Sequence, residues 1–210
     1  MNEAALMLAE GVRMEDVDRA LTDFGFPVGP FVLYDEVGLE VAQHAGETVA
    51  RAFGDRIPPA TVVAELVARG DTGRKVGRGF YLWPRPSHPL GMLLRVIPSP
   101  KRKPNPVVYG VTPRRQVGQK EIQDRLVLLF VNEAIRCLDE SVLQSAADGD
   151  LGAILGLGFP PFTGGPFHYA DSVGARVLVD RLRVLADSFG PRFEPAESLV
   201  QDRHFYAEIE

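Results

Sequence analysis

Residues 25–30 read GFPVGP and residues 158–166 read GFPPFTGGP, so an uncommon string of glycine, phenylalanine and proline occurs twice in 210 residues. Glycine tolerates the left-handed backbone that ends many helices. Proline is favoured in the first turn of the helix that follows. Each string therefore predicts a sharp corner between two helices, and the occurrence of two such strings predicts a duplicated helical domain.

Other matches extend the duplication beyond these corners. The string NEAALML near the N-terminus matches NEAIRCL in the second half of the chain. The distance between matching residues grows by three between the Asn and the Gly-Phe-Pro string, and by three again inside the turn. Insertions in turns with matching helices on either side are what a duplicated helical domain shows. The matched pairs, which lie 130, 133, 136 and 136 residues apart, are Asn2 and Asn132, Gly25 and Gly158, Pro30 and Pro166, and Gly38 and Gly174.

The composition argues against several classes of function. A net charge of −5 and the lack of a long basic run argue against nucleic-acid binding. No apolar run approaches the roughly 20 residues that a membrane span needs. The single cysteine, Cys137, predicts neither a disulfide framework nor a cysteine metal cluster, and the four histidines lack metal-ligand spacing. We therefore expect no metal site and a cytoplasmic protein.

Helical spacing, punctuated by glycine and proline, predicts an all-α protein with two lobes. Prolines crowd residues 84–119 and predict a linker between a first domain (1–83) and a second domain (120–210). The first domain is expected to be truncated at its N-terminus, because the helix before Asn132 reaches back to Lys120 while only Met1 precedes Asn2. The expected helices are 2–10, 15–24, 31–37, 39–53, 60–69, 120–138, 150–157, 172–189 and 195–202.

Several strings resemble those of a known enzyme family. NEAALMLAEG, DVDRAL, GFPVGPFVLYDEVGLEVAQH and GRKVGRGFYLW resemble the C-terminal region of 3-hydroxyacyl-CoA dehydrogenases. DGDLGAILGLGFPPFTGGPFHYADSVGA, followed by VDRLRVLADSFGPRFEPAESL, most resembles the multifunctional fatty-acid oxidation enzymes of the α-subunit type. The resemblance covers 2–83 and 120–205. It implies two tandem homologous all-α domains of the 6-phosphogluconate dehydrogenase C-terminal-like type, and NAD-dependent oxidation of 3-hydroxyacyl-CoA in fatty-acid β-oxidation.

The resemblance also implies that parts of the enzyme lie elsewhere. In that family the catalytic His–Glu pair and a Ser lie on a nicotinamide-binding domain, which these residues do not resemble. GRKVGRG (73–79) is not followed by a helix and is rejected as a dinucleotide fingerprint. The family's substrate-polarising Asn lies eight residues before the position of Asn2, and that position is not among these residues. Its counterpart in the second domain is Asp124, which cannot donate a hydrogen bond. The second domain is therefore expected to be a degenerate copy.

This chain is accordingly expected to be the substrate-side and assembly portion of the dehydrogenase, without catalytic, cofactor-binding or metal-binding residues. NAD belongs to the parent family, and the expected partners are acyl-CoA, a nicotinamide-binding domain in cis or in trans, and further copies of the chain. A stand-alone acyl-CoA-binding or protein-binding module and one chain of a split enzyme stay open as alternatives. Lys75 and Arg78 either meet coenzyme A phosphates or are solvated charges. The corner after Gly-Pro either presents helix N–H groups to a ligand or is purely structural. The expected substrate-binding residues are Phe26, Pro27, Gly29, Pro30, Phe31, Lys75 and Arg78.

Overall fold

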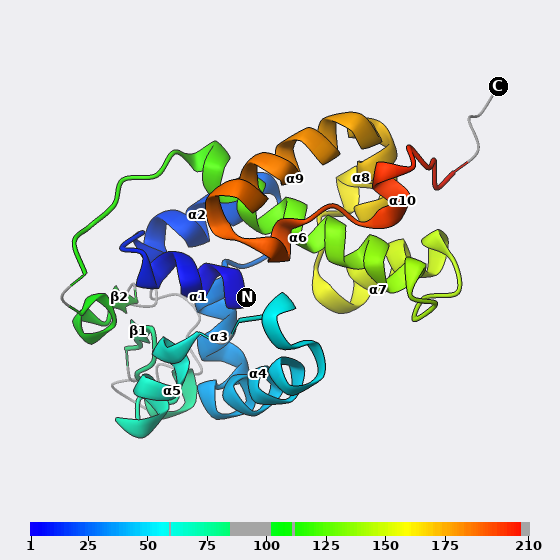
Figure 1. Ribbon diagram of the computed structural model, residues 1–210. Coiled ribbons are helices and arrows are strands. Elements are labelled where there is room, and N and C mark those ends of the chain that lie inside the picture. The colour runs from blue at the N-terminus through cyan, green and yellow to red at the C-terminus, as the bar shows by residue number, and fades with distance from the viewer. Residues whose placement is uncertain (59, 85–101, 111, 207–210) are drawn as a thin grey trace. The chain divides into compact units, whose positions relative to one another are not determined.

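The computed structural model describes residues 1–58, 60–84, 102–110 and 112–206, and most of them are helical (Figure 1). This confirms the predicted all-α class. The chain divides into two compact units. The first unit comprises Met1–Asp18 and Val28–Gln116, and the second comprises Arg19–Pro27 and Val117–Glu210.

The first unit is a set of short helices joined by tight glycine turns. Its helices are α1 (Asn2–Ala9), the start of α2 (Met14–Phe24), α3 (Pro30–Val37), α4 (Leu39–Phe53) and α5 (Thr61–Ala68). The unit also contains the short 3₁₀ helices η1 (Gly54–Arg56, between α4 and α5), η2 (Arg74–Val76) and η4 (Pro106–Tyr109), and the two-residue strands β1 (Tyr81–Leu82) and β2 (Lys103–Pro104).

Aromatic side chains form the centre of the first unit. Phe31 and Phe80 are fully buried, and their ring centroids lie 4.8 Å apart. Tyr34, one helical turn after Phe31, lies 5.3 Å from Phe80. Helix α3 therefore begins at the Gly-Pro corner and faces the tail that follows α5.

The proline-rich window is partly bound to the first unit. Strands β1 and β2 are antiparallel, with Leu82 opposite Lys103. Asn105, 2% exposed, donates its Nδ2 hydrogens to Asp71 Oδ2 (3.1 Å) and to the Gly79 carbonyl (2.8 Å). We call residues 102–110 the strap. Residues 85–101 and 111 of the expected linker lie outside the described residues, and the domain limits at 83 and 120 stay predictions.

The second unit contains the longest helix of the described chain. Its elements are α6 (Gln119–Asp139), α7 (Ala146–Leu157), η5 (Pro161–Thr163), α8 (Pro166–Val173), α9 (Ala175–Phe189), η6 (Pro191–Phe193) and α10 (Glu197–Val200). The expected single helix over 172–189 is wrong, because Gly174, with φ of 90°, separates α8 from α9. The expected start of a helix at Asp150 is also wrong, because α7 begins four residues earlier. Ser145 caps α7 by accepting a hydrogen bond from the Asp148 N–H.

The core of the second unit is also aromatic. Phe159, which follows α7, is fully buried and lies 4.9 Å from Phe130 of α6. Arg125 of α6 is fully buried as well, with its guanidinium 3.8 Å from the centre of the Phe189 ring. An arginine stacked on an aromatic face keeps its charge in a favourable setting inside a core.

Candidate functional site: two carboxylate clasps and the corners they hold

A buried carboxylate closes the Gly-Pro corner of the first unit. Asp18 lies on α2 and is 5% exposed. Its Oδ1 accepts a hydrogen bond from the Phe31 N–H at 2.8 Å, in the first turn of α3. Its Oδ2 accepts a second one from the Tyr81 hydroxyl at 2.7 Å. The helix N-terminus that a ligand's anion could have occupied is therefore satisfied by the chain itself.

A second carboxylate, Asp35 at the end of α3, fixes the tail that carries Tyr81. It accepts hydrogen bonds from the backbone N–H groups of Phe80 and Tyr81 and from Trp83 Nε1, each at 2.8 Å. Asp35 is 1% exposed, so these bonds lie inside the unit. We call Asp18, Asp35, Phe80, Tyr81 and Trp83 the first clasp.

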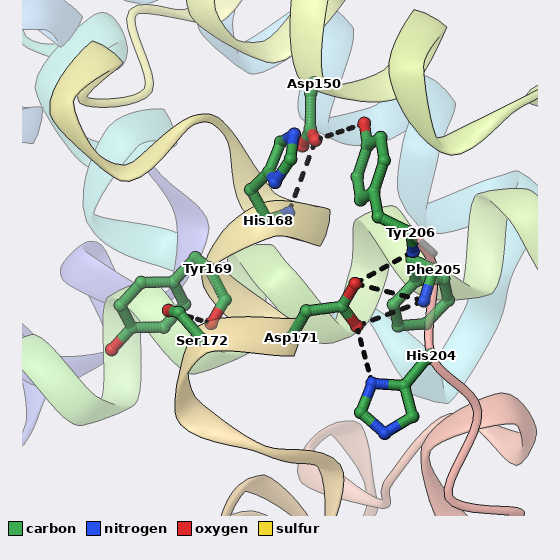
Figure 2. Close-up of polar contacts among 8 residues, drawn as sticks. All are labelled: Asp150, His168, Tyr169, Asp171, Ser172, His204, Phe205 and Tyr206. Carbon is green, nitrogen blue, oxygen red and sulfur yellow. Dashed lines mark hydrogen bonds and ion pairs between the residues drawn. The ribbon is translucent and has the colours of Figure 1, made fainter. Parts of the chain in front are cut away.

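The second unit contains an equivalent arrangement, which Figure 2 shows. Asp150 of α7 accepts hydrogen bonds from the Phe167 N–H (2.8 Å), the His168 N–H (3.3 Å) and the Tyr206 hydroxyl (2.7 Å). Asp171 of α8 accepts from the N–H groups of Phe205 (3.0 Å) and Tyr206 (2.9 Å). We call Asp150, Asp171, Phe205 and Tyr206 the second clasp.

The two clasps extend the internal duplication into the hydrogen bonds. In both units a carboxylate on one helix caps the next helix and also accepts a hydrogen bond from a tyrosine hydroxyl. A second carboxylate accepts hydrogen bonds from the backbone N–H groups of that tyrosine and of the residue before it. A glycine precedes the capped helix in both, and a β-carbon on Gly29 or Gly165 would collide with Asp18 or Asp150. The corresponding pairs are Asp18 and Asp150, Phe31 and Phe167, Asp35 and Asp171, Phe80 and Phe205, and Tyr81 and Tyr206.

The clasps were not predicted, although the sequence contains a signal for them. The strings DVD (16–18) and DGD (148–150) match, as do GFY (79–81) and HFY (204–206). The tyrosines are 125 residues apart whereas the other matched residues are 130 to 136 apart. The first copy is therefore longer than the second between the second carboxylate of its clasp and the tyrosine. A comparison that keeps the offset at 130 to 136 does not find this match.

Burial sets the electrostatics of the first clasp. Loss of hydration raises the pKa of Asp18 to about 6, and the hydrogen bonds from Tyr81 and Phe31 oppose that rise. Burial likewise raises the pKa of Asp35. The pKa of the Tyr81 phenol is raised, first by burial and then by the Asp18 charge. The first clasp therefore contains a buried carboxyl group, Asp18, whose pKa is raised to about 6 and which also caps α3.

The corner residues predicted to flank an acyl chain lie in two units. Phe26 and Pro27 belong to the second unit, where the half-buried Phe26 ring lies 5.6 Å from Phe159. Gly29, Pro30 and Phe31 belong to the first unit and are buried there. The Phe31 side chain is fully enclosed by the core, and its role in substrate binding stays a prediction.

The two predicted phosphate-binding cations are exposed and lie close together in the chain. Arg78 pairs through Nε with Asp71 Oδ1 at 2.6 Å, which gives it a structural partner. Lys75, in η2, has no ion pair within the described part of the chain. Contact of either residue with coenzyme A stays a prediction.

The polar residues drawn around the second clasp in Figure 2 do not include a serine paired with a histidine or a carboxylate. Ser172 donates its hydroxyl to the Tyr169 carbonyl in its own helix (Figure 2). The His168 ring is stacked on Tyr206 at 3.8 Å between centroids. Asp124 pairs with Lys120 at 3.2 Å and also with Arg181, which fits a helix salt-bridge face. Over the described ranges, no group of three or more His, Cys, Asp and Glu side chains could hold a metal ion.

The glycine-rich string 73–79 does not fit a dinucleotide. It forms the η2 turn, not a turn from a strand into a helix. Its glycines have another use, because a β-carbon on Gly73 would lie 2.6 Å from the Asp35 carbonyl oxygen and one on Gly79 would collide with the Asp35 carboxylate. These glycines let the tail approach Asp35 closely.

Comparison with known proteins finds a family model that matches part of the chain. Residues 1–83 match the model of the 3-hydroxyacyl-CoA dehydrogenase C-terminal domain. The fold resembles 3-hydroxybutyryl-CoA dehydrogenase from Escherichia coli K12, with a TM-score of 0.69 and 22% identity over 95% of this chain and 56% of that one. It also resembles the dehydrogenase part of multifunctional enzyme 1 from C. elegans, with a TM-score of 0.63 and 18% identity over 96% of this chain and 46% of that one. The chain thus spans about half the length of these structures, and the resemblance to 3-hydroxyacyl-CoA dehydrogenases is confirmed.

Proposed function

We propose that this chain supplies the substrate-side and assembly portion of an NAD-dependent 3-hydroxyacyl-CoA dehydrogenase that acts in fatty-acid β-oxidation. The observation that carries the proposal is the match of residues 1–83 to the C-terminal domain of that family. The internal duplication supports it, because the family resemblance extends through both copies of the corner. We place the protein in the cytoplasm. Within the described residues, no helix is both long and apolar enough to cross a membrane.

The proposal assigns the chemical step to another domain. A dehydrogenase of this class needs a general base for the hydroxyl proton and a nicotinamide to take the hydride. The carboxylates of the two clasps already accept hydrogen bonds from helix N-termini and from the backbone of the segments that carry Tyr81 and Tyr206. A nicotinamide-binding domain, in cis or in trans, would therefore bring the base and NAD, while this chain presents the corner of the first unit to the acyl chain.

The second unit has a supporting role in this proposal. Its Asp124, at the position that corresponds to the family's substrate-polarising amide, already pairs with Lys120 and Arg181. A carboxylate held between two cations accepts hydrogen bonds and cannot donate one to a substrate carbonyl. We infer that this copy is retained for packing and assembly rather than for a second active centre.

A mixing experiment tests the proposal. The purified chain would be combined with a separately produced nicotinamide-binding domain of a 3-hydroxyacyl-CoA dehydrogenase, and NADH oxidation would be followed with acetoacetyl-CoA as substrate. We expect the mixture to exceed the rate of the nicotinamide-binding domain alone. A rate that does not change when the chain is added would count against a substrate-side role.

The clasps also keep a stand-alone module open as an alternative. Each unit satisfies the N-terminus of its own capped helix from within, through Asp18 or Asp150, and so needs no further domain to do so. Such a module would bind acyl-CoA or a protein partner without catalysis. An immunoblot of source cells separates the two ideas. A band near 23.0 kDa favours the module, and a band several times larger favours a piece of the dehydrogenase.

A further inference from the structure

The first unit gathers five exposed cations from two distant segments of the chain. Strand pairing places Leu82 opposite Lys103, and an isolated bridge joins Leu82 to Arg78. Lys103 and Arg78 therefore flank the same residue, although 25 positions separate them in the sequence. The basic cluster, as we call it, consists of Arg74, Lys75, Arg78, Arg102 and Lys103, all of which are exposed.

The single tryptophan of the chain organises this cluster. The guanidinium carbon of Arg74 lies 5.0 Å from the centre of the Trp83 ring, and that of Arg102 lies 5.9 Å from it. Arg102 also lies 5.0 Å from the Tyr81 ring. Trp83 is itself fixed by its hydrogen bond to Asp35. The two arginines are thus held over a rigid aromatic surface, which lowers the entropy that they would lose on binding a ligand.

The charge of the cluster is only partly balanced. Arg74 pairs with Glu36, and Arg78 pairs with Asp71. For Lys75, Arg102 and Lys103, no ion pair occurs within the described residues. Two of the five cations are therefore paired and three are not, over the described part of the chain, in a protein whose net charge is −5. Such unbalanced positive charge attracts anions, and guanidinium groups bind phosphate oxygens in a geometry that suits them.

We propose that the basic cluster binds the phosphate groups of a coenzyme A-type ligand, namely its 3′-phosphate and its pyrophosphate. This inference rests on the proposed function, since that function supplies an acyl-CoA. It adds Arg74 and the strap residues Arg102 and Lys103 to the two cations that the sequence suggested. The strap is thereby a contributor to the ligand site, and Asn105 positions it through hydrogen bonds to Asp71 and Gly79.

Trp83 makes the proposal directly measurable. Titration with adenosine 3′,5′-bisphosphate at low salt should change the Trp83 fluorescence and reach saturation. The R102Q/K103Q variant should bind about fivefold more weakly, the order expected for the loss of two exposed charges. The R176Q/R183Q variant removes the same charge from exposed positions of the second unit and should bind like the original protein. Added salt should weaken the binding.

Two results would overturn the proposal. One is the absence of saturable binding, or binding that R102Q/K103Q leaves unchanged. The other is a fluorescence change with phosphatidylglycerol vesicles, absent with phosphatidylcholine vesicles and with the nucleotide, which would assign the cluster to lipid headgroups. If the nucleotide fails to bind but the mixing experiment still restores dehydrogenase activity, only the cluster is refuted and the proposed function stands.

Discussion

The substitution Tyr81→Phe tests how the first clasp works, because it removes one hydroxyl and leaves the aromatic packing. The hydroxyl donates to Asp18 Oδ2 at 2.7 Å in a buried setting. A hydrogen bond to a charged partner is worth about 1.5 to 3 kcal/mol, against about 1 kcal/mol for one between neutral groups. The free energy of unfolding should therefore fall by about 2 kcal/mol where Asp18 is ionised and by about 1 kcal/mol where it is protonated.

The pH dependence gives this prediction its sign. The folded-state pKa of Asp18 is about 6, above its ordinary value of 3.8, so the stability contributed by its protonated form is lost as pH rises through about 6. The Tyr81 hydrogen bond holds that pKa down, and its removal raises the pKa further. More stability is then lost above pH 6, and the penalty of the substitution must grow between about pH 4.5 and about pH 7.5.

Urea unfolding followed by Trp83 fluorescence measures this penalty, since Trp83 lies in the same clasp and is the only tryptophan. Tyr34→Phe is the matched control, because within the described residues the Tyr34 hydroxyl has no hydrogen bond and burial raises its pKa to about 12. Its small effect should not vary over this pH range. A penalty for Tyr81→Phe that is equal at both pH values, or larger at the acidic one, would refute the assignment of Asp18 as the titrating partner.

Other substitutions probe the packing. Gly29→Ala should lower the free energy of unfolding by about 1 to 3 kcal/mol, because its φ of −74° suits alanine and only the collision with Asp18 opposes it. Gly46→Ala, at an open position of α4, should instead raise it by about 0.5 to 1 kcal/mol, and thermal unfolding of both variants checks the pair. Asn132→Ala should cost about 2 to 3 kcal/mol in urea unfolding, because the fully buried amide accepts from the Ala196 N–H; a cost below about 1 kcal/mol would contradict this.

The sequence predicted the helices better than the contacts that hold them. Gly-Pro at 29–30 and the glycine at 38 marked α3 to within one residue, because those signals are local. Helix α8 was missed and its end was merged with α9, although Gly165-Pro166 repeats the helix-start signal of Gly29-Pro30. The helices themselves need no long-range information beyond an apolar face.

The clasps could not be derived from local patterns in the same way. Asp18 and Tyr81 are 63 residues apart, and neither residue type predicts a partner at that distance. The strap is a similar case, because its prolines are compatible with a free tether as well as with a bound segment. Only the fold shows that Asn105 anchors it to Asp71 and Gly79. The sequence does show the duplication, and the same hydrogen-bond pattern then occurs in both clasps.

The most direct test of the proposed function is the dehydrogenase assay on the chain by itself. The purified protein would be incubated with NADH and acetoacetyl-CoA, and the loss of NADH absorbance would be followed against a buffer blank. We expect a rate equal to the blank, because the general base and the nicotinamide would belong to another domain. Oxidation of NADH above the blank that depends on both the protein and acetoacetyl-CoA would contradict it.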